Sequence, residues 1–350
     1  MKRVLQIAVI AALTVFFLWL FLRNANLSEV GAILRRSSFG WVLVGFAVNI
    51  IALVSRTVRW RTLLDPEDPP PFYATFFANA VGYMSSIVLP IRASDLARPV
   101  LLSRRTSHRF SGALGTILCE RVLDLTSILT MFVFFAALRW NEFSHDPATA
   151  AWFYIVRAGA IASAVILTVL WSFLIGLRFS RDTIRRLHEA LGRLLPKRIR
   201  PSWMHFFDTF AETLRISKYP GALAKVLFCT VLTWTCLTAQ FWFATKAVHQ
   251  PLPYDSSFFV TGVTTVGLAI PTPGGIGGFH KACQLVLTRF YAFSVESSVA
   301  VAVLFHVIGT LPVLTIGLFL FAKEGVSLKQ LRGTDEEETA NRQPPTANQP

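Results

Sequence analysis

Six apolar runs, each long enough to cross a bilayer, dominate the sequence. A transmembrane helix needs about 20 mostly apolar residues to cross roughly 30 Å of hydrocarbon. The runs are Val4 to Leu22, Trp41 to Val58, Thr116 to Leu138, Ile155 to Leu177, Leu223 to Ala244 and Val299 to Phe321. The chain is therefore predicted to be an all-α, polytopic helical membrane protein with about six full spans.

The composition excludes an ordinary soluble domain. Hydrophobic residues make up 53% of the 350 positions and charged residues only 15%, with a mean hydropathy of +0.51. Lys2 and Arg3 precede the first run as in a signal peptide, but the run is too long and lacks a cleavage site, so we interpret it as a retained anchor. The four cysteines show no metal-site spacing. We expect no metal site and no cofactor.

The basic residues predict an orientation. A formal charge of +14 is compatible with nucleic-acid binding, but these residues flank the apolar runs, and no nucleic-acid partner is expected. With both termini in the cytoplasm and two broken segments that enter and leave on one side, 24 of the 34 Lys and Arg residues face the cytoplasm. This excess agrees with the positive-inside rule.

The two broken segments follow Phe76-Phe77 and Phe258-Phe259, and both end in prolines. Paired hydrophobic segments broken by Pro or Gly are typical of transporter binding sites. The charge count places the first on the cytoplasmic side and the second on the outer side. The sequence therefore predicts two inverted re-entrant hairpins.

The first broken segment carries charge between Pro90 and Pro99, which are expected to interrupt any continuous helix. Irregular backbone at membrane depth lies in protein or lines a water-filled cavity. Arg92 and Arg98 would suit a phosphate there, with Asp95 holding one arginine in position. Alternatively, these arginines extend to the lipid headgroups at the interface.

Glu120, Arg121 and Asp124 lie about one turn inside a predicted span, where ionisable side chains are costly. Glu120 and Asp124 share a helix face and would meet Arg92 or Arg98, forming a closed network that accepts or releases a headgroup. Two other interpretations are open. The three residues would simply lock helices together, or one carboxylate would carry a proton.

The second broken segment is predicted to be a gate. It contains two prolines and four glycines, whose backbone adopts conformations closed to other residues, and it leads into a helix whose N-terminus favours an anion. The alternative is that the glycines only permit tight packing of a hairpin. With Pro90, the gate residues are Pro271, Pro273, Gly274, Gly275, Gly277, Gly278, His280 and Lys281.

Two further segments have a distinct composition. Residues 178–218 are predicted to contain an amphipathic helix on the inner leaflet, within a transmembrane domain of residues 1–322. Residues 323–350 form a cytoplasmic tail whose acidic and Pro/Gln/Asn-rich end is predicted to be mostly disordered.

Three motifs, in this order, resemble the transmembrane region of lysylphosphatidylglycerol synthases and the free-standing flippase-like proteins that share it. They are Pro90 to Arg98, Glu120-Arg121-Val122-Leu123-Asp124, and Pro271-Thr272-Pro273-Gly274-Gly275. Ser94-Asp95 replaces the usual Gly-Glu, and His280 replaces an acidic residue. The resemblance implies an inner-membrane protein with two re-entrant segments that moves lipids between leaflets. The aminoacyl-transferring domain is absent, so lysyl transfer is not expected.

The predicted function is lipid translocation without enzymatic activity. Arg92, Asp95, Arg98, Glu120, Arg121 and Asp124 would bind an anionic, phosphate-bearing headgroup of a membrane lipid. Two alternatives stay open: a secondary transporter of a small anion, and a scaffold for a lipid or cell-envelope enzyme. The oligomeric state is not predicted.

Overall fold

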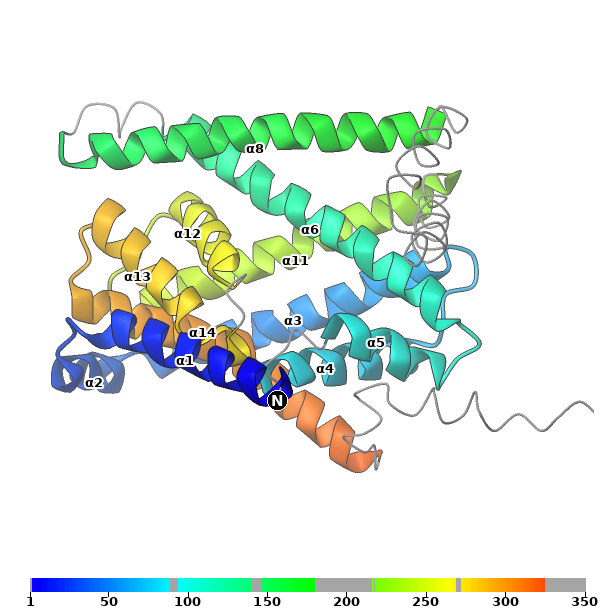
Figure 1. The fold of residues 1–350 in the computed structure, drawn as a ribbon, viewed down its shortest axis with the longest axis horizontal. Helices are drawn as coiled ribbons and strands as arrows, with labels where there is room; N and C mark the ends of the chain where they lie inside the picture. The colour runs from blue at the N-terminus through cyan, green and yellow to red at the C-terminus, as the bar shows by residue number, and fades with distance from the viewer. Residues whose placement is uncertain are drawn as a thin grey trace, which may run out of the picture.

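The computed structural model describes residues 2–88, 94–139, 147–179, 216, 218–268 and 272–324, and these residues form helices and no strands (Figure 1). The elements are α1 (Lys2–Leu22), α2 (Leu27–Arg36), α3 (Phe39–Leu64), α4 (Phe72–Val88), α5 (Ser94–Ser103), α6 (Phe110–Leu138), α8 (Pro147–Phe179), α11 (Pro220–Ala247), α12 (Tyr254–Gly267), η2 (Pro273–Gly275), α13 (Gly278–Phe290) and α14 (Val295–Lys323).

Within the described residues, five helices, α3, α6, α8, α11 and α14, are long and apolar enough to cross a membrane. A sixth span is formed if α1 and α2 are counted together, although they meet at a bend of 80°. The prediction of a polytopic helical membrane protein is confirmed. One boundary differs, because α3 continues to Leu64 rather than ending near Val58.

Two pairs of shorter helices lie within the bundle. α4 packs against α5, and α12 packs against α13 (Figure 1). These helices have 17, 10, 14 and 13 residues, fewer than the roughly 20 residues of a full span. The two pairs correspond to the predicted broken segments.

Pro99 does not end a helix, contrary to the prediction. It lies inside α5, which continues to Ser103. Proline removes one helical hydrogen bond, and that loss is tolerated when packing holds the helix. Here Pro99 is buried, and the Ser94 backbone N–H at the start of α5 donates to Oγ of Ser86 on α4 at 2.8 Å.

The turn before α13 has the backbone that its glycines predict. Gly274, Gly275 and Gly277 have φ values of 58°, 73° and 98°, in the left-handed region that favours glycine. A Cβ atom on Gly277 would also lie 2.6 Å from Cβ of Phe17 on α1. Glycine therefore fixes both the shape of this turn and the approach of α1.

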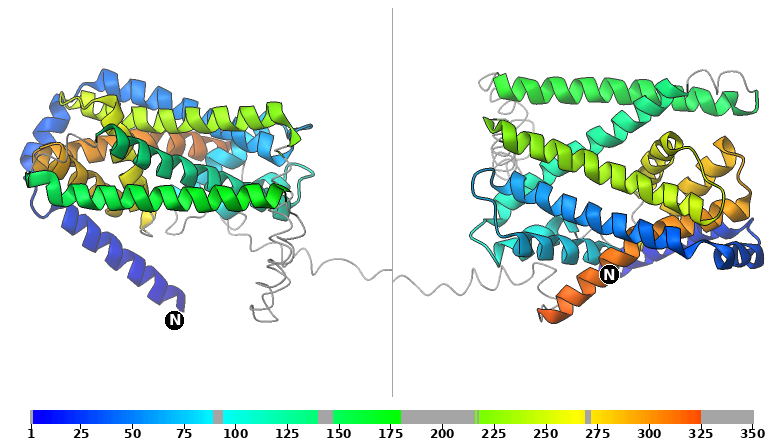
Figure 2. Two further views of the ribbon diagram at one scale, coloured as in Figure 1. Left: turned by 90° about the horizontal axis from the view of Figure 1, so that it is seen from above. Right: turned by 180° about the vertical axis from the view of Figure 1, so that it is seen from behind.

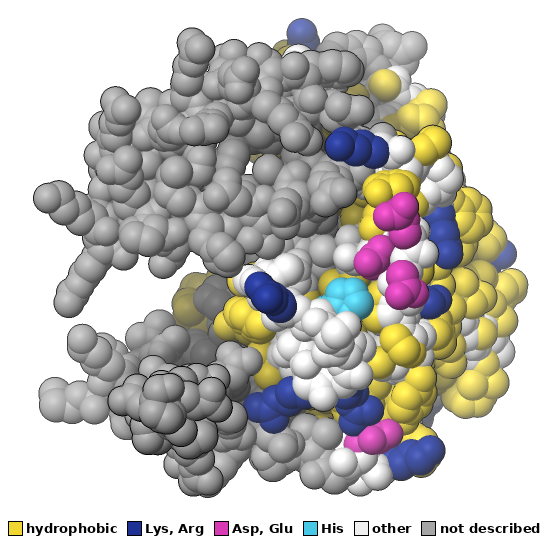
Figure 3. All heavy atoms as spheres, turned by 90° about the vertical axis from the view of Figure 1, so that its right-hand side faces the viewer, with side chains coloured by type: hydrophobic (Ala, Val, Ile, Leu, Met, Phe, Trp, Pro, Cys, Tyr) yellow, Lys and Arg dark blue, Asp and Glu magenta, His cyan; other side chains and the backbone are white. Residues whose placement is uncertain are grey.

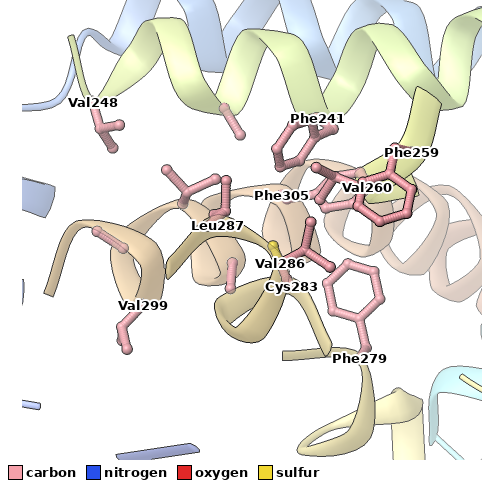
Figure 4. Packing of buried hydrophobic residues seen from close by; sticks show 14 of the residues in the cluster. Phe241, Val248, Phe259, Val260, Phe279, Cys283, Val286, Leu287, Val299 and Phe305 are labelled. Carbon is pink, nitrogen blue, oxygen red and sulfur yellow. The ribbon is translucent and has the colours of Figure 1, made fainter. Parts of the chain in front are cut away.

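The largest apolar core lies where α11, α12, α13 and α14 meet (Figure 4). Phe279 from α13 and Phe241 from α11 both contact Phe305 of α14, with ring centroids 5.0 and 5.3 Å apart. A second core surrounds α4 and includes Phe77, Val81 and residues of α5.

α14 takes part in both cores, because it packs against α13 and also against α4. The contact with α4 is close, since a Cβ atom on Gly317 would lie 2.8 Å from the carbonyl oxygen of Ala80. Pro312 lies inside α14, between Phe305 and Gly317. One helix therefore joins the two short helix pairs.

The views from above and behind show the long helices running along the length of the molecule, while α1 diverges from the bundle (Figure 2). At the end where α3 finishes and α6 begins, charged side chains of both signs gather on the described surface (Figure 3). The candidate site lies in the helices near this end.

Candidate functional site: a buried network of arginines and carboxylates

α6 contributes three charged side chains from adjacent turns, Glu120, Arg121 and Asp124. The Glu120 side chain is only 1% exposed and that of Asp124 is 19% exposed, whereas Arg121 is 43% exposed. Buried carboxylates are stable only when cations or hydrogen-bond donors compensate their charge. The surrounding helices supply both.

Arg59 of α3 is the central cation, and the sequence analysis did not identify it. Its Nε lies 3.2 Å from Oε1 of Glu120, and its Nη1 lies 2.8 Å from Oδ1 of Asp124. Nη1 also reaches Oγ1 of Thr230 on α11 at 3.5 Å. One guanidinium therefore joins α3 to both carboxylates of α6.

Arg98 of α5 is the second buried cation. Its Nη2 lies 2.7 Å from Oε2 of Glu120, at a distance that makes an ion pair although the angles do not meet hydrogen-bond geometry. The guanidinium also lies 4.3 Å from the ring of Trp60 and 5.1 Å from the ring of Tyr83. Arg98 is fully buried within the protein.

Two nitrogens of Arg98, Nε and Nη1, have no hydrogen-bond partner among the residues that the structure describes. A buried donor without a partner is energetically costly. Arg98 therefore retains hydrogen-bonding capacity for an acceptor.

Arg121 forms the more exposed part of the network. It makes an ion pair with Asp95 of α5, and its Nε lies 3.2 Å from Oδ2 of that carboxylate. Its Nη1 lies 3.3 Å from Oδ2 of Asp124. Asp124 also accepts a hydrogen bond from Nε1 of Trp234 at 3.3 Å. The ion pairs thus connect α3, α5 and α6.

The charges in this network balance. Arg59, Arg98 and Arg121 face Asp95, Glu120 and Asp124. This equality explains how so many ionic groups persist among apolar helices, because each charge has a partner of opposite sign. It also fits the interpretation that the network locks helices together, because its ion pairs join α3, α5 and α6.

Most of the predicted headgroup residues therefore lie together. Asp95, Arg98, Glu120, Arg121 and Asp124 form one connected set, whereas Arg92 and Pro90 lie outside the described residues. Pro271 and most of the predicted connector at 178–218 also lie outside them, as does the tail beyond Glu324.

The predicted gate residues form a separate group. The Gly277 backbone N–H donates to Nδ1 of His280 at 3.4 Å, and the His280 ring lies 4.7 Å from that of His306 on α14. Lys281 donates to Oε1 of Gln284 at 2.6 Å. The turn approaches the first helix pair at its tip, where a Cβ atom on Gly274 would lie 3.5 Å from the Ile87 carbonyl oxygen.

A charge count does not reveal Arg59, because the predicted headgroup residues already include three arginines and three carboxylates. The apolar run ends near Val58, so no sequence signal indicates that α3 continues to Leu64 and includes Arg59. Within the described residues, no group of three or more His, Cys, Asp or Glu side chains is placed to hold a metal ion.

The long apolar helices, the two short helix pairs and the ion network buried among them define a multi-pass membrane protein. Residues 3–317 match the model of the family described as lysylphosphatidylglycerol synthase TM region, and the chain belongs to this family. The resemblance stated from the motifs is thereby confirmed.

The chain is also similar to a distant relative over most of that protein's length. The chain is 22% identical over 240 residues to UPF0104 membrane protein MJ1078 of Methanocaldococcus jannaschii. The match covers 68% of this chain and 93% of that protein.

Proposed function

We propose that the protein moves an anionic, phosphate-bearing lipid between the leaflets of the inner membrane without catalysing a chemical reaction. The observation that carries this proposal is Arg98, a buried cation with two unpaired nitrogens on a helix too short to span the membrane. A guanidinium offers a planar set of donors that fits phosphate oxygens. Family membership supports a flippase-like role.

In this proposal α4 with α5, and α12 with α13, are re-entrant pairs that open from opposite sides. Both termini lie in the cytoplasm, and the first pair opens there. The headgroup exchanges with Glu120 at Arg98, while the glycine-rich turn at Gly274 to Gly278 opens the outer side. An incoming anionic headgroup replaces a carboxylate as the partner of an arginine, so the arginine stays paired. This exchange lowers the free-energy cost of placing one headgroup inside the bundle.

Lipid scrambling in reconstituted vesicles tests the proposal. The full chain should carry a fluorescent anionic lipid across the bilayer, and Arg98→Gln should abolish this transport while Arg98→Lys retains part of it. Arg36→Gln, at the far end of the bundle on α2, is the charge-matched control. Unchanged scrambling by a correctly folded Arg98→Gln variant would contradict the proposal.

A further inference from the structure

Arg56 of α3 lies next to the network but is not part of its ion pairs. Within the described chain, Arg59, Arg98 and Arg121 each have a carboxylate oxygen within ion-pair distance, and no such pair is found for Arg56. Arg56 is half-buried, whereas Arg98 is fully buried. This corner of the network therefore carries one more cation than the charge balance requires.

Tyr83 of α4 connects Arg56 with Arg98. The Cζ atom of Arg56 lies 5.1 Å from the centroid of the Tyr83 ring, and the Cζ atom of Arg98 also lies 5.1 Å from it. Both contacts are within the range in which an aromatic ring stabilises a cation. One partly exposed guanidinium and one buried guanidinium thus share an aromatic neighbour.

Arg56 and Arg98 lack different kinds of interaction partner. Among the described residues, Arg56 has no carboxylate within ion-pair distance, and Arg98 has a counter-charge in Glu120 but lacks acceptors for Nε and Nη1. A group with one negative charge and several acceptor oxygens would satisfy both. A phosphodiester has these properties, whereas a phosphomonoester can carry a second negative charge that this corner does not balance.

We propose that Arg56, Tyr83 and Arg98 form a two-position anion site in which Arg56 receives a singly charged phosphodiester headgroup and Arg98 holds it inside the bundle. The inference rests on the proposed function, since it specifies the headgroup and its entry point. Arg56 is then a specificity-determining residue, because it supplies the one charge that the headgroup neutralises. Tyr83 is the aromatic neighbour that both guanidiniums share.

Native mass spectrometry of the purified full chain directly measures lipid binding at the proposed anion site. The chain is mixed with phosphatidylglycerol, phosphatidic acid or phosphatidylcholine, or with glycerophosphoglycerol, the soluble phosphodiester that corresponds to the phosphatidylglycerol headgroup. Phosphatidylglycerol should bind most strongly, and Arg56→Gln should weaken its binding by about tenfold, the effect of losing one charged contact. Arg56→Lys should restore part of the binding, and Arg36→Gln should leave it unchanged.

Several results would overturn the inference. Equal binding of phosphatidylglycerol to Arg56→Gln and the unmodified chain is one, and stronger binding of phosphatidic acid is another. Binding of glycerophosphoglycerol as tight as that of the lipid would identify a soluble anion as the ligand and would also contradict the inference. Thermal unfolding of each variant excludes misfolding as the cause, and Arg56→Lys provides the second test if Arg56→Gln does not fold.

Scrambling assays on the same variants separate this inference from the proposed function. If lipids cross with the unmodified chain and with Arg56→Gln at equal rates, the proposed translocation stands and the role of Arg56 is wrong. If Arg56→Gln loses phosphatidylglycerol binding while the unmodified chain moves no lipid, the anion site stands and translocation is wrong.

Discussion

Gly82 of α4 lies directly against Arg98 of α5, so closely that a Cβ atom on Gly82 would overlap Cγ of Arg98. The atom it would meet is near the backbone of Arg98 and not at the flexible end of its side chain. Glycine at position 82 therefore permits the buried position of this arginine.

We expect Gly82→Ala to destabilise the protein by about 1–3 kcal/mol, the usual cost of overpacking a core. Thermal unfolding in detergent measures this change. Gly112→Ala is the matched control, because a Cβ atom there would meet nothing within 4 Å. An unchanged unfolding temperature for Gly82→Ala would show that Arg98 moves aside easily.

Glu120→Gln should be among the most destabilising changes in the network. It leaves Arg59 and Arg98 buried with a lost counter-charge, and removing one partner of a buried pair costs about 3–5 kcal/mol. Arg121→Gln should cost only about 1 kcal/mol or less, since the Arg121 and Asp95 side chains are partly exposed.

Combining Arg98→Met with Glu120→Gln should recover part of the stability lost in Glu120→Gln alone, because the double variant no longer buries an unpaired Arg98. Denaturant unfolding of the single and double variants in one detergent gives the coupling energy. Additive losses would mean that the pair at 2.7 Å contributes little.

The sequence predicted the spans well because long apolar runs have few alternatives in a membrane. It also predicted that Arg98 and the carboxylates of α6 would meet, since charges at membrane depth need partners. It did not predict which arginine binds which carboxylate. Arg56 lies near the end of an apolar run and Arg59 follows it, so both resemble interfacial residues. Only the packing of α3 against α6 and α11 shows that Arg59 is buried.

Gly277→Ala should disturb the turn before α13 more than Gly262→Ala disturbs α12. Gly277 has a φ of 98° and faces Phe17, whereas a Cβ atom on Gly262 would meet nothing within 4 Å. Backbone strain alone should lower the free energy of unfolding of Gly277→Ala by about 1–3 kcal/mol. Thermal unfolding and protease sensitivity of α1 give the comparison, and equal behaviour of the two variants would contradict it.

Labelling of single cysteines tests the proposed re-entrant arrangement. Cysteines placed at Phe72 and Ser107 flank the first pair, and cysteines at Gln250 and Ala292 flank the second; all four positions are exposed. The first two should react with an impermeant reagent from one side and the last two from the opposite side. Labelling of Phe72→Cys and Ser107→Cys from opposite sides would show that this pair crosses the membrane.

Acid should release the end of α14 from α4 and α5. Tyr73 donates to Oε1 of Glu324 at 2.6 Å, and Nη2 of Arg105 lies 3.0 Å from Oε2. These hydrogen bonds hold the pKa of Glu324 below its usual range. The pKa of Glu324 is therefore lower in the folded protein than in the unfolded chain. Above the pKa of the unfolded chain the contact stabilises the folded protein fully, and this stabilisation is lost as the pH falls through the pKa of Glu324 in the folded protein.

Hydrogen exchange in the last turn of α14 measures this release. Protection should fall with acidification in the unmodified chain, and Glu324→Gln should remove the pH dependence. Equal pH profiles for the two proteins would exclude Glu324 as the titrating group.

The position of α14 has a consequence for both helix pairs. Its Phe305 side chain packs on Phe279 of α13, and its Gly317 lies against Ala80 of α4. If α14 tilts as one body, both contacts must change together. A bend at Pro312 would let each half move alone. In the proposed translocation, the stiffness of this single turn would therefore determine whether the two helix pairs move in alternation or independently.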